Sequence, residues 1–242
     1  MFKIIFNFFL LVGLVDFGYS SVVPFVTKCK AADSKCLKKS SQAIIPMFAN
    51  GIPEFGVEKL DPVHFKDPID ASTSGLKLIL KDTTFTGLKD CVVKKIQRDV
   101  DKNKLIGKLM CTVSVEGDYE MDGQLLIVRV QGQGKIHVLL RKIVISLEAD
   151  MSEKVGKDGQ KHWDIKRFTH SFELLDKADV EFENLFTGND VIGRAASQVI
   201  ATSGNDIVIE VGPPVVKAMA TRVIANIKKF FNNVPPGDLS LD

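Results

Sequence analysis

The chain has 242 residues, of which 45% are hydrophobic, and 32 Lys and Arg balance 30 Asp and Glu. Charges of both signs are interspersed, so no basic segment marks a nucleic-acid-binding protein and no acidic tail is present. The length suits one large domain or two small ones, and no linker interrupts the chain.

The first twenty residues have the pattern of a secretory signal peptide. Lys3 supplies the positive charge, Ile4 to Val15 form an apolar run, and Gly18-Tyr19-Ser20 is a small-x-small cleavage site. The apolar run is too short to span a bilayer, and no other long apolar run follows. We therefore predict a signal peptide over residues 1–20, a mature domain over residues 21–242, and no stable membrane insertion.

Four cysteines in a secreted chain suggest two disulfides. Cys29 and Cys36 are close enough in "CKAADSKC" to clamp a short loop, and we predict that they pair. Cys91 and Cys111 flank a predicted hairpin turn at "VDKNK" and could form a bridge across it.

The pairing of Cys91 with Cys111 depends on the phase of the two strands. Alternation points the even positions of the first strand inward (Val92, Ile96 and Val100) and the odd positions of the second (Leu109, Val113 and Val115). The two cysteines would then face opposite sides of the sheet unless a bulge shifts the register, so this bridge stays open.

The predicted elements begin with a helix over Cys36–Ala49. Its apolar residues recur at spacings of three and four, and Gly51 and Pro53 end it. An extended, proline-punctuated passage follows to about Asp70.

From Gly75 to about Phe182 the apolar residues recur with a period of two, which predicts strands. Short connections at "DKNK", "MDG", "GQG" and "GKDGQ" favour an antiparallel meander, because a parallel crossover needs about a dozen residues or more. The candidate strands are Leu76–Lys81, Val92–Val100, Leu105–Tyr119, Gln124–Gln131, Lys135–Leu140, Ile143–Leu147, His162–Leu174 and Asp179–Phe182.

Two helices are predicted at the C-terminal end. The first covers residues 185–201, with Asn189 or Asp190 as its cap, and the second covers residues 213–234, with proline in its first turn. One face of the second helix is apolar and must lie against the concave side of the sheet. We predict an α+β fold in which one long antiparallel sheet packs its concave side against this helix.

Gly132-Gln133-Gly134 invites comparison with a dinucleotide-binding loop. That motif needs a third glycine three residues later, where this sequence has His137, and a following helix, where it continues as a strand. We interpret the two glycines as a bulge or sharp bend that curls the sheet.

No constellation of catalytic residues emerges. The four histidines are scattered without zinc-site spacing, no G-x-S-x-G is present, and no nucleophile–base pair can be named. We predict no enzyme activity, no metal and no cofactor. The apolar composition allows an elongated internal cavity, and a fully packed core is the alternative.

Six segments in this order resemble the takeout and juvenile-hormone-binding-protein family of insects. They are two cysteines near the mature N-terminus, "NGIPEFGVEKLDP", "FTGLKD", "GDYEMDGQLLIVRVQGQGK", "FENLFTGN" and "IANIKKFFNNVP". The resemblance implies a Cys29–Cys36 disulfide and a tubular lipid-binding fold, in which a long, strongly curved antiparallel β-sheet wraps around a long C-terminal α-helix and encloses a hydrophobic tunnel. It also implies a secreted carrier of terpenoid or fatty-acid-like ligands in haemolymph or chemosensory fluid, in a family linked to feeding, circadian output and courtship.

Alternation around Arg129 predicts which side chains would line such a tunnel, and Tyr119 is a candidate for orienting a ligand. The lining candidates are Val113, Val115, Leu126, Val128, Val130, Ile136, Val138, Met219, Val223, Ile227 and Phe230. Two other functions remain open: an extracellular signalling or interaction protein with a packed core, and a secreted hydrolase.

Overall fold

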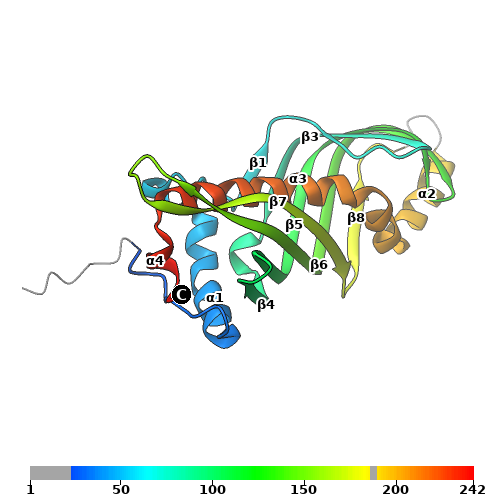
Figure 1. Cartoon of the computed structure of the whole chain (residues 1–242). Helices are drawn as coiled ribbons and strands as arrows, with labels where there is room; N and C mark the ends of the chain where they lie inside the picture. Colours follow the sequence, from blue (N-terminus) through cyan, green and yellow to red (C-terminus); the bar gives the residue numbers. More distant parts are fainter. Residues whose placement is uncertain (1–22, 186–189) are drawn as a thin grey trace, which may run out of the picture.

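The computed structural model describes residues 23–185 and 190–242, so the predicted signal peptide and the cap at Asn189 lie outside it. The helices are α1 (Ser34–Asn50), α2 (Asp190–Thr202), α3 (Gly204–Asn233) and α4 (Pro236–Leu239), with 3-10 turns η1 (Pro53–Phe55) and η2 (Leu88–Asp90). The strands are β1 (Val63–Phe65), β2 (Ile69–Asp70), β3 (Leu76–Thr86), β4 (Val92–Asp99), β5 (Lys104–Leu125), β6 (Val128–Val155), β7 (Lys161–Leu174) and β8 (Ala178–Phe182). The long antiparallel sheet packs against the long helix α3, which confirms the predicted α+β class (Figure 1).

The strands β5 and β6 form the centre of one antiparallel sheet, in which the main strand order is β1-β3-β5-β6-β7. They have 22 and 28 residues, and β4 pairs with one half of β5 while β7 and β8 pair with different parts of β6. The single strand β6 contains the predicted strands Lys135–Leu140 and Ile143–Leu147 and the second half of the predicted strand Gln124–Gln131. The predicted turns at "MDG" and "GQG" are wrong, because the chain reverses at Leu126 and Ile127 instead.

Gly132 and Gly134 lie inside β6, where the pairing with β5 continues without a shift. A Cβ on Gly134 would lie 2.5 Å from the carbonyl oxygen of Glu183, and a Cβ on Gly132 would lie 2.9 Å from that of Asn184. The glycines therefore let the backbone that follows β8 lie close against β6, to which it is bridged at Gly132 and Leu185. The predicted bulge at this place is wrong, because the pairing of β5 with β6 has no shift here.

A register shift between Val93 and Lys95 settles the second disulfide. Val92 is 42% exposed and Val93 is buried, so the predicted inward phase is wrong at the start of β4. Cys91 and Val93 consequently face the same side as Cys111. Both disulfides, Cys29–Cys36 and Cys91–Cys111, are formed.

The helix α1 confirms the first predicted helix, whereas α3 begins nine residues before the predicted start at Pro213. Pro213 and Pro214 lie inside the helix, where each removes a backbone hydrogen bond. The turns before them bury Ile207, Val208 and Val211 against the sheet. This burial outweighs the local cost of the prolines, so the helix continues through them.

His162, on β7, holds the C-terminal end of α3. Its Nδ1 lies 3.0 Å from the carbonyl oxygen of Phe231, and its Nε2 lies 2.9 Å from the Asp158 carboxylate. Acceptors on both sides favour a ring that carries both protons. Burial lowers the pKa of His162, but Asp158 and the carbonyl groups of Phe231 and Val234 outweigh it and raise the pKa above its usual value.

Candidate functional site: an apolar cavity

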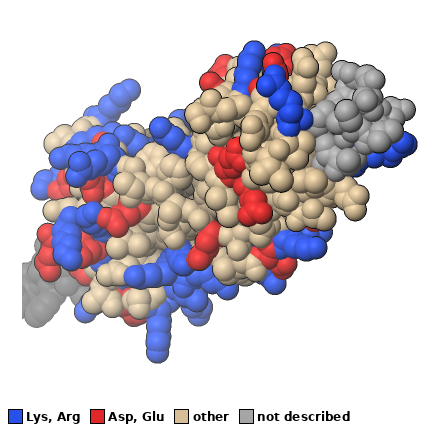
Figure 2. Space-filling model, turned by 90° about the vertical axis from the view of Figure 1, so that its right-hand side faces the viewer, with Lys and Arg blue, Asp and Glu red and all other residues tan. Residues whose placement is uncertain are grey.

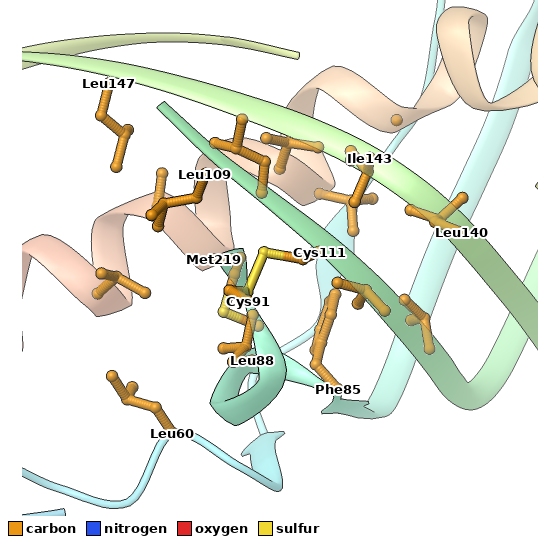
Figure 3. A pocket seen from close by; sticks show the side chains of 18 of the residues that line it. Leu60, Phe85, Leu88, Cys91, Leu109, Cys111, Leu140, Ile143, Leu147 and Met219 are labelled. Carbon is orange, nitrogen blue, oxygen red and sulfur yellow. A yellow bond between two sulfur atoms is a disulfide. The ribbon is translucent and has the colours of Figure 1, made fainter. Parts of the chain in front are cut away.

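A cavity of about 400 Å³ lies between the sheet and α3, and α1 and η2 close part of its wall. The lining residues of α3 run from Ile207 to Phe231, over which a helix rises about 36 Å. The cavity is therefore elongated along α3. Figure 3 shows side chains from the strands, η2 and α3 around a common space, with the Cys91–Cys111 bridge among them.

The wall of the cavity is almost entirely hydrocarbon. Apart from the hydroxyl group of Ser41, the described residues of the lining contribute aliphatic and aromatic side chains, Gly212 and the Cys91–Cys111 bridge. Within the described ranges no group of three His, Cys, Asp or Glu could hold a metal ion, and no helix is long and apolar enough to cross a membrane. Such a wall can surround an apolar molecule, and its described residues place no acid or base beside the Ser41 hydroxyl group to activate it.

Eight of the predicted lining residues border the cavity. They come from β5, β6 and α3, and alternation along the strands and the 3.6-residue period of the helix located them correctly. These residues are Val113, Val115, Ile136, Val138, Met219, Val223, Ile227 and Phe230. That they contact a ligand stays a prediction.

The four other candidates, Tyr119, Leu126, Val128 and Val130, lie outside the lining. Val130 is fully buried by neighbouring side chains, while Leu126 and Val128 lie at the β5–β6 turn and pack on the same cluster. The prediction that Val130 points inward is correct, but neighbouring side chains fill the interior at this end of the sheet.

Tyr119 is buried, and its polar group already has a protein partner. Its hydroxyl group donates a hydrogen bond of 2.7 Å to the carbonyl oxygen of Glu183, and its ring packs edge-on against Phe182. Burial, together with the negative charge of Glu183, raises the pKa of Tyr119 to about 12. The side chain therefore closes the filled end of the interior instead of facing the cavity.

The sequence analysis did not predict the lining residues that come from α1, η2 and β3. The lining also includes Ile44 and Phe48 of α1, Leu88 of η2, and Leu78, Leu80 and Phe85 of β3. The apolar stripe of α1 and the alternation of β3 were visible signals. What the sequence did not show was that α1 packs against η2 and β4 at the side of the sheet.

The fold holds an apolar cavity between the sheet and α3, as a binding protein for apolar molecules requires. The chain belongs to the haemolymph juvenile hormone binding protein family, whose model matches residues 6–240. This confirms the resemblance seen in the sequence. Because the family is one of binding proteins, it also confirms that the protein is not an enzyme.

Particular relatives agree with this assignment. The chain is 22% identical to the circadian clock-controlled protein daywake of Drosophila melanogaster, over 86% of this chain and 84% of daywake. It is also 22% identical to a putative beta-carotene-binding protein of Schistocerca gregaria, over 82% and 80% of the two chains. The crystal structure of Takeout 1 from Epiphyas postvittana superposes with a TM-score of 0.85 at 29% identity, covering 90% of this chain and all of that one.

Proposed function

We propose that the protein is a secreted, non-enzymatic carrier that binds one small, elongated apolar ligand in a tunnel between the strongly curved sheet and α3. The observation that carries this proposal is the cavity of about 400 Å³, whose lining contains a single side-chain hydroxyl group among the residues that the structure describes. An empty apolar space of this kind stays dry, so an apolar ligand can enter without displacing bound water.

The energetics allow useful affinity without a charged anchor. Burying about 15 ligand carbons at about 0.8 kcal/mol each gives roughly 12 kcal/mol. Association costs of at least about 4 kcal/mol leave roughly 8 kcal/mol, which corresponds to micromolar affinity. A hydrocarbon wall is therefore sufficient for a carrier.

The relatives suggest which ligands belong in the first test. The family takes its description from juvenile hormone, and one relative is named for β-carotene, so terpenoids and similarly long apolar molecules are the leading class. Fatty-acid-like molecules have the same elongated hydrocarbon character. The likeness to daywake makes circadian physiology the setting to examine.

The carrier proposal is tested on protein secreted from insect cells. Native mass spectrometry followed by solvent extraction should identify a copurified apolar molecule, and a fluorescent fatty acid should bind saturably with a stoichiometry near one. Absence of saturable uptake for a terpenoid, a fatty acid and a carotenoid alike would contradict the proposal.

Secretion is a separate part of the proposal. Two disulfides suit an oxidising extracellular compartment, and the predicted signal peptide would direct the chain there. N-terminal sequencing of the secreted protein should begin at Ser21. A mature protein that still contains the apolar run Ile4 to Val15 would contradict cleavage at the predicted site.

The alternative function, a signalling or interaction protein with a packed core, receives no support from the cavity. It would be favoured by a melting temperature that no apolar ligand changes, together with a specific protein partner.

A further inference from the structure

Six lysines from three separate segments gather at one side of the molecule, although none forms a long basic run in the sequence. We call them the lysine patch. They are Lys35, Lys38 and Lys39 on α1, Lys89 on η2, and Lys94 and Lys95 on β4, and all six are exposed.

The packing of α1 against β4 and η2 brings these lysines together. Lys35, Lys38 and Lys39 share one helix face with Gln42, because they occupy positions i, i+3, i+4 and i+7. The Gln42 side chain pairs with the edge of β4: its amide nitrogen donates to the carbonyl oxygen of Cys91 at 3.0 Å, and its oxygen accepts from the N–H of Val93 at 2.8 Å. The lysine-bearing face of α1 therefore borders the start of β4.

The positive charge of the patch exceeds the negative charge of the elements that carry it. The three elements α1, η2 and β4 contain seven Lys or Arg and two Asp, a net charge of +5, whereas the whole chain carries only +2. Across the ranges that the structure describes, none of the six lysines forms an ion pair. The remainder of the chain is accordingly net negative, and one of its carboxylates, that of Asp61, accepts a hydrogen bond from the N–H of Lys89 beside the patch.

The opposite end of the molecule has a different charge pattern. Figure 2 looks onto the end where α2 lies and shows positive and negative side chains interspersed among uncharged ones. At this end the positive side chains are therefore accompanied by negative ones, unlike those of the lysine patch.

The patch covers the outside of a wall whose inner side borders the cavity. On β4, Val93 and Ile96 line the cavity, while Lys94 and Lys95 between them are exposed. On α1, Ile44 and three neighbours within one turn, Ser41, Ile45 and Phe48, line the same space. A surface bound to the patch would lie one layer of secondary structure from the cavity, about 10 Å.

We propose that the lysine patch docks the protein onto a membrane surface that carries anionic phospholipids. Lysine is a compact, strongly hydrated charge that suits diffuse attraction to many phosphates, whereas recognition of one carboxylate favours the fork of arginine. Val92, which is 42% exposed beside Lys94, adds an apolar side chain that can enter the headgroup region. Docking itself does not depend on the proposed carrier function, but its use for collecting or releasing cargo does.

The experiment measures binding of ligand-free protein to phosphatidylcholine vesicles with and without about 30% phosphatidylserine, by co-sedimentation. The patch variant is K35E/K94E/K95E. The matched control is K66E/K157E/K166E, which removes the same total charge from three exposed lysines that also form no ion pair within the described ranges. Unfolding curves confirm that both variants fold.

The wild type is expected to bind only the anionic vesicles, and less tightly as salt rises. Each lysine contributes about 1 kcal/mol, or about fivefold in affinity, so the patch variant should bind at least about 100-fold more weakly. The control should keep most of its affinity. An equal loss in both variants would show that net charge alone governs binding, and would overturn the proposal.

Two further measurements separate the remaining outcomes. Soluble polyglutamate is the probe for an acidic protein partner, and binding to it without binding to vesicles would assign the patch to such a partner and overturn membrane docking. A fluorescent fatty acid tests the cavity in solution, where the patch variant should bind as well as the wild type. Loss of vesicle docking with intact ligand binding, in the patch variant alone, is the result that we expect.

Discussion

The paired strands β5 and β6 pass through two environments within a few residues. Near Val115 and Val138, which pair across the strands, the inner face borders an empty cavity. Near Tyr119 and Gly134, also a direct pair, the same face is filled by the Tyr119 ring and covered by the backbone around Glu183. The sheet is continuous through both regions, so the strand pairing does not decide which becomes hollow.

What differs is how the space above the sheet is closed. At the filled end, glycines in β6 let another stretch of backbone approach, and Tyr119 donates its hydrogen bond to that stretch. At the hollow end only side chains project from the sheet and α3, and they leave room between them. A cavity is thus present at the end where main chain does not lie close against the sheet. The inner residues of the filled end and of the hollow end are both large and apolar.

The largest expected effect comes from filling the hollow end. Met219 lies in the cavity wall on α3, and Met219→Trp should displace at least three or four ligand carbons. At about 0.8 kcal/mol per carbon, affinity for an elongated apolar probe should fall by about 100-fold or more. Titration with a fluorescent fatty acid measures this. Ile127→Trp, at the exposed β5–β6 turn, is the control and should bind as the wild type does.

The second effect concerns the bridge in the cavity wall. Replacing Cys91 and Cys111 by alanine opens a loop with a sequence separation of 20 residues and should cost about 3 kcal/mol of unfolding free energy. Replacing Cys29 and Cys36, separated by seven, should cost about 2 kcal/mol. Denaturant unfolding of the two double variants measures both. A smaller loss for the cavity bridge would show that strain or residual structure, rather than loop length, determines its contribution.

The filled end is tested by adding one methyl group. Gly134→Ala places a Cβ against the carbonyl oxygen of Glu183 and should lower the unfolding free energy by about 1–3 kcal/mol. Gly107→Ala is the matched change in β5, where the nearest atom, on Ile96, is 3.8 Å away, and it should be nearly neutral. Equal stability of the two variants would mean that the backbone around Glu183 moves away from the added methyl group at little cost, and that it does not close the filled end.

The smallest effect is a pH dependence at the C-terminal end of α3. The pKa of His162 is raised by folding, so its stabilising contribution is complete below the unfolded pKa, about 6.5, and is lost as pH rises through the folded pKa. His162→Gln should therefore reduce stability more at pH about 5.5 than at pH about 8.5, by about 0.3–1 kcal/mol, as for a cation at a helix C-terminus. Denaturant unfolding at both pH values measures it. A pH-independent difference would show that the ring acts by packing alone.

Much of this architecture was readable from periodicity. The stripe of α1, the alternation of the strands and the apolar face of α3 each required burial on one side, which located eight lining residues. The positions of the turns between the strands could not be predicted in the same way. Gly132 and Gly134 look like a turn in sequence, and the actual turn at Leu126 and Ile127 contains neither glycine nor proline.

The remaining errors arose where distant segments meet. The side of the sheet that Cys91 faces depended on a register shift at Val93. The filled end depended on the close approach of the backbone around Glu183 to β6. The lysine patch is a third instance, since α1 and β4 are far apart in sequence and interspersed charge predicted no basic surface. Local patterns determine which side of an element is apolar, but contacts between elements determine what covers it.

The lone hydroxyl group of Ser41 has a consequence for competition between cargoes. With so few polar groups to recognise a head group, molecules of similar girth but unlike chemistry, such as an ester, an acid and a plain hydrocarbon, should displace one another from the interior. Which of them the protein carries would then depend on their relative abundance in the surrounding fluid.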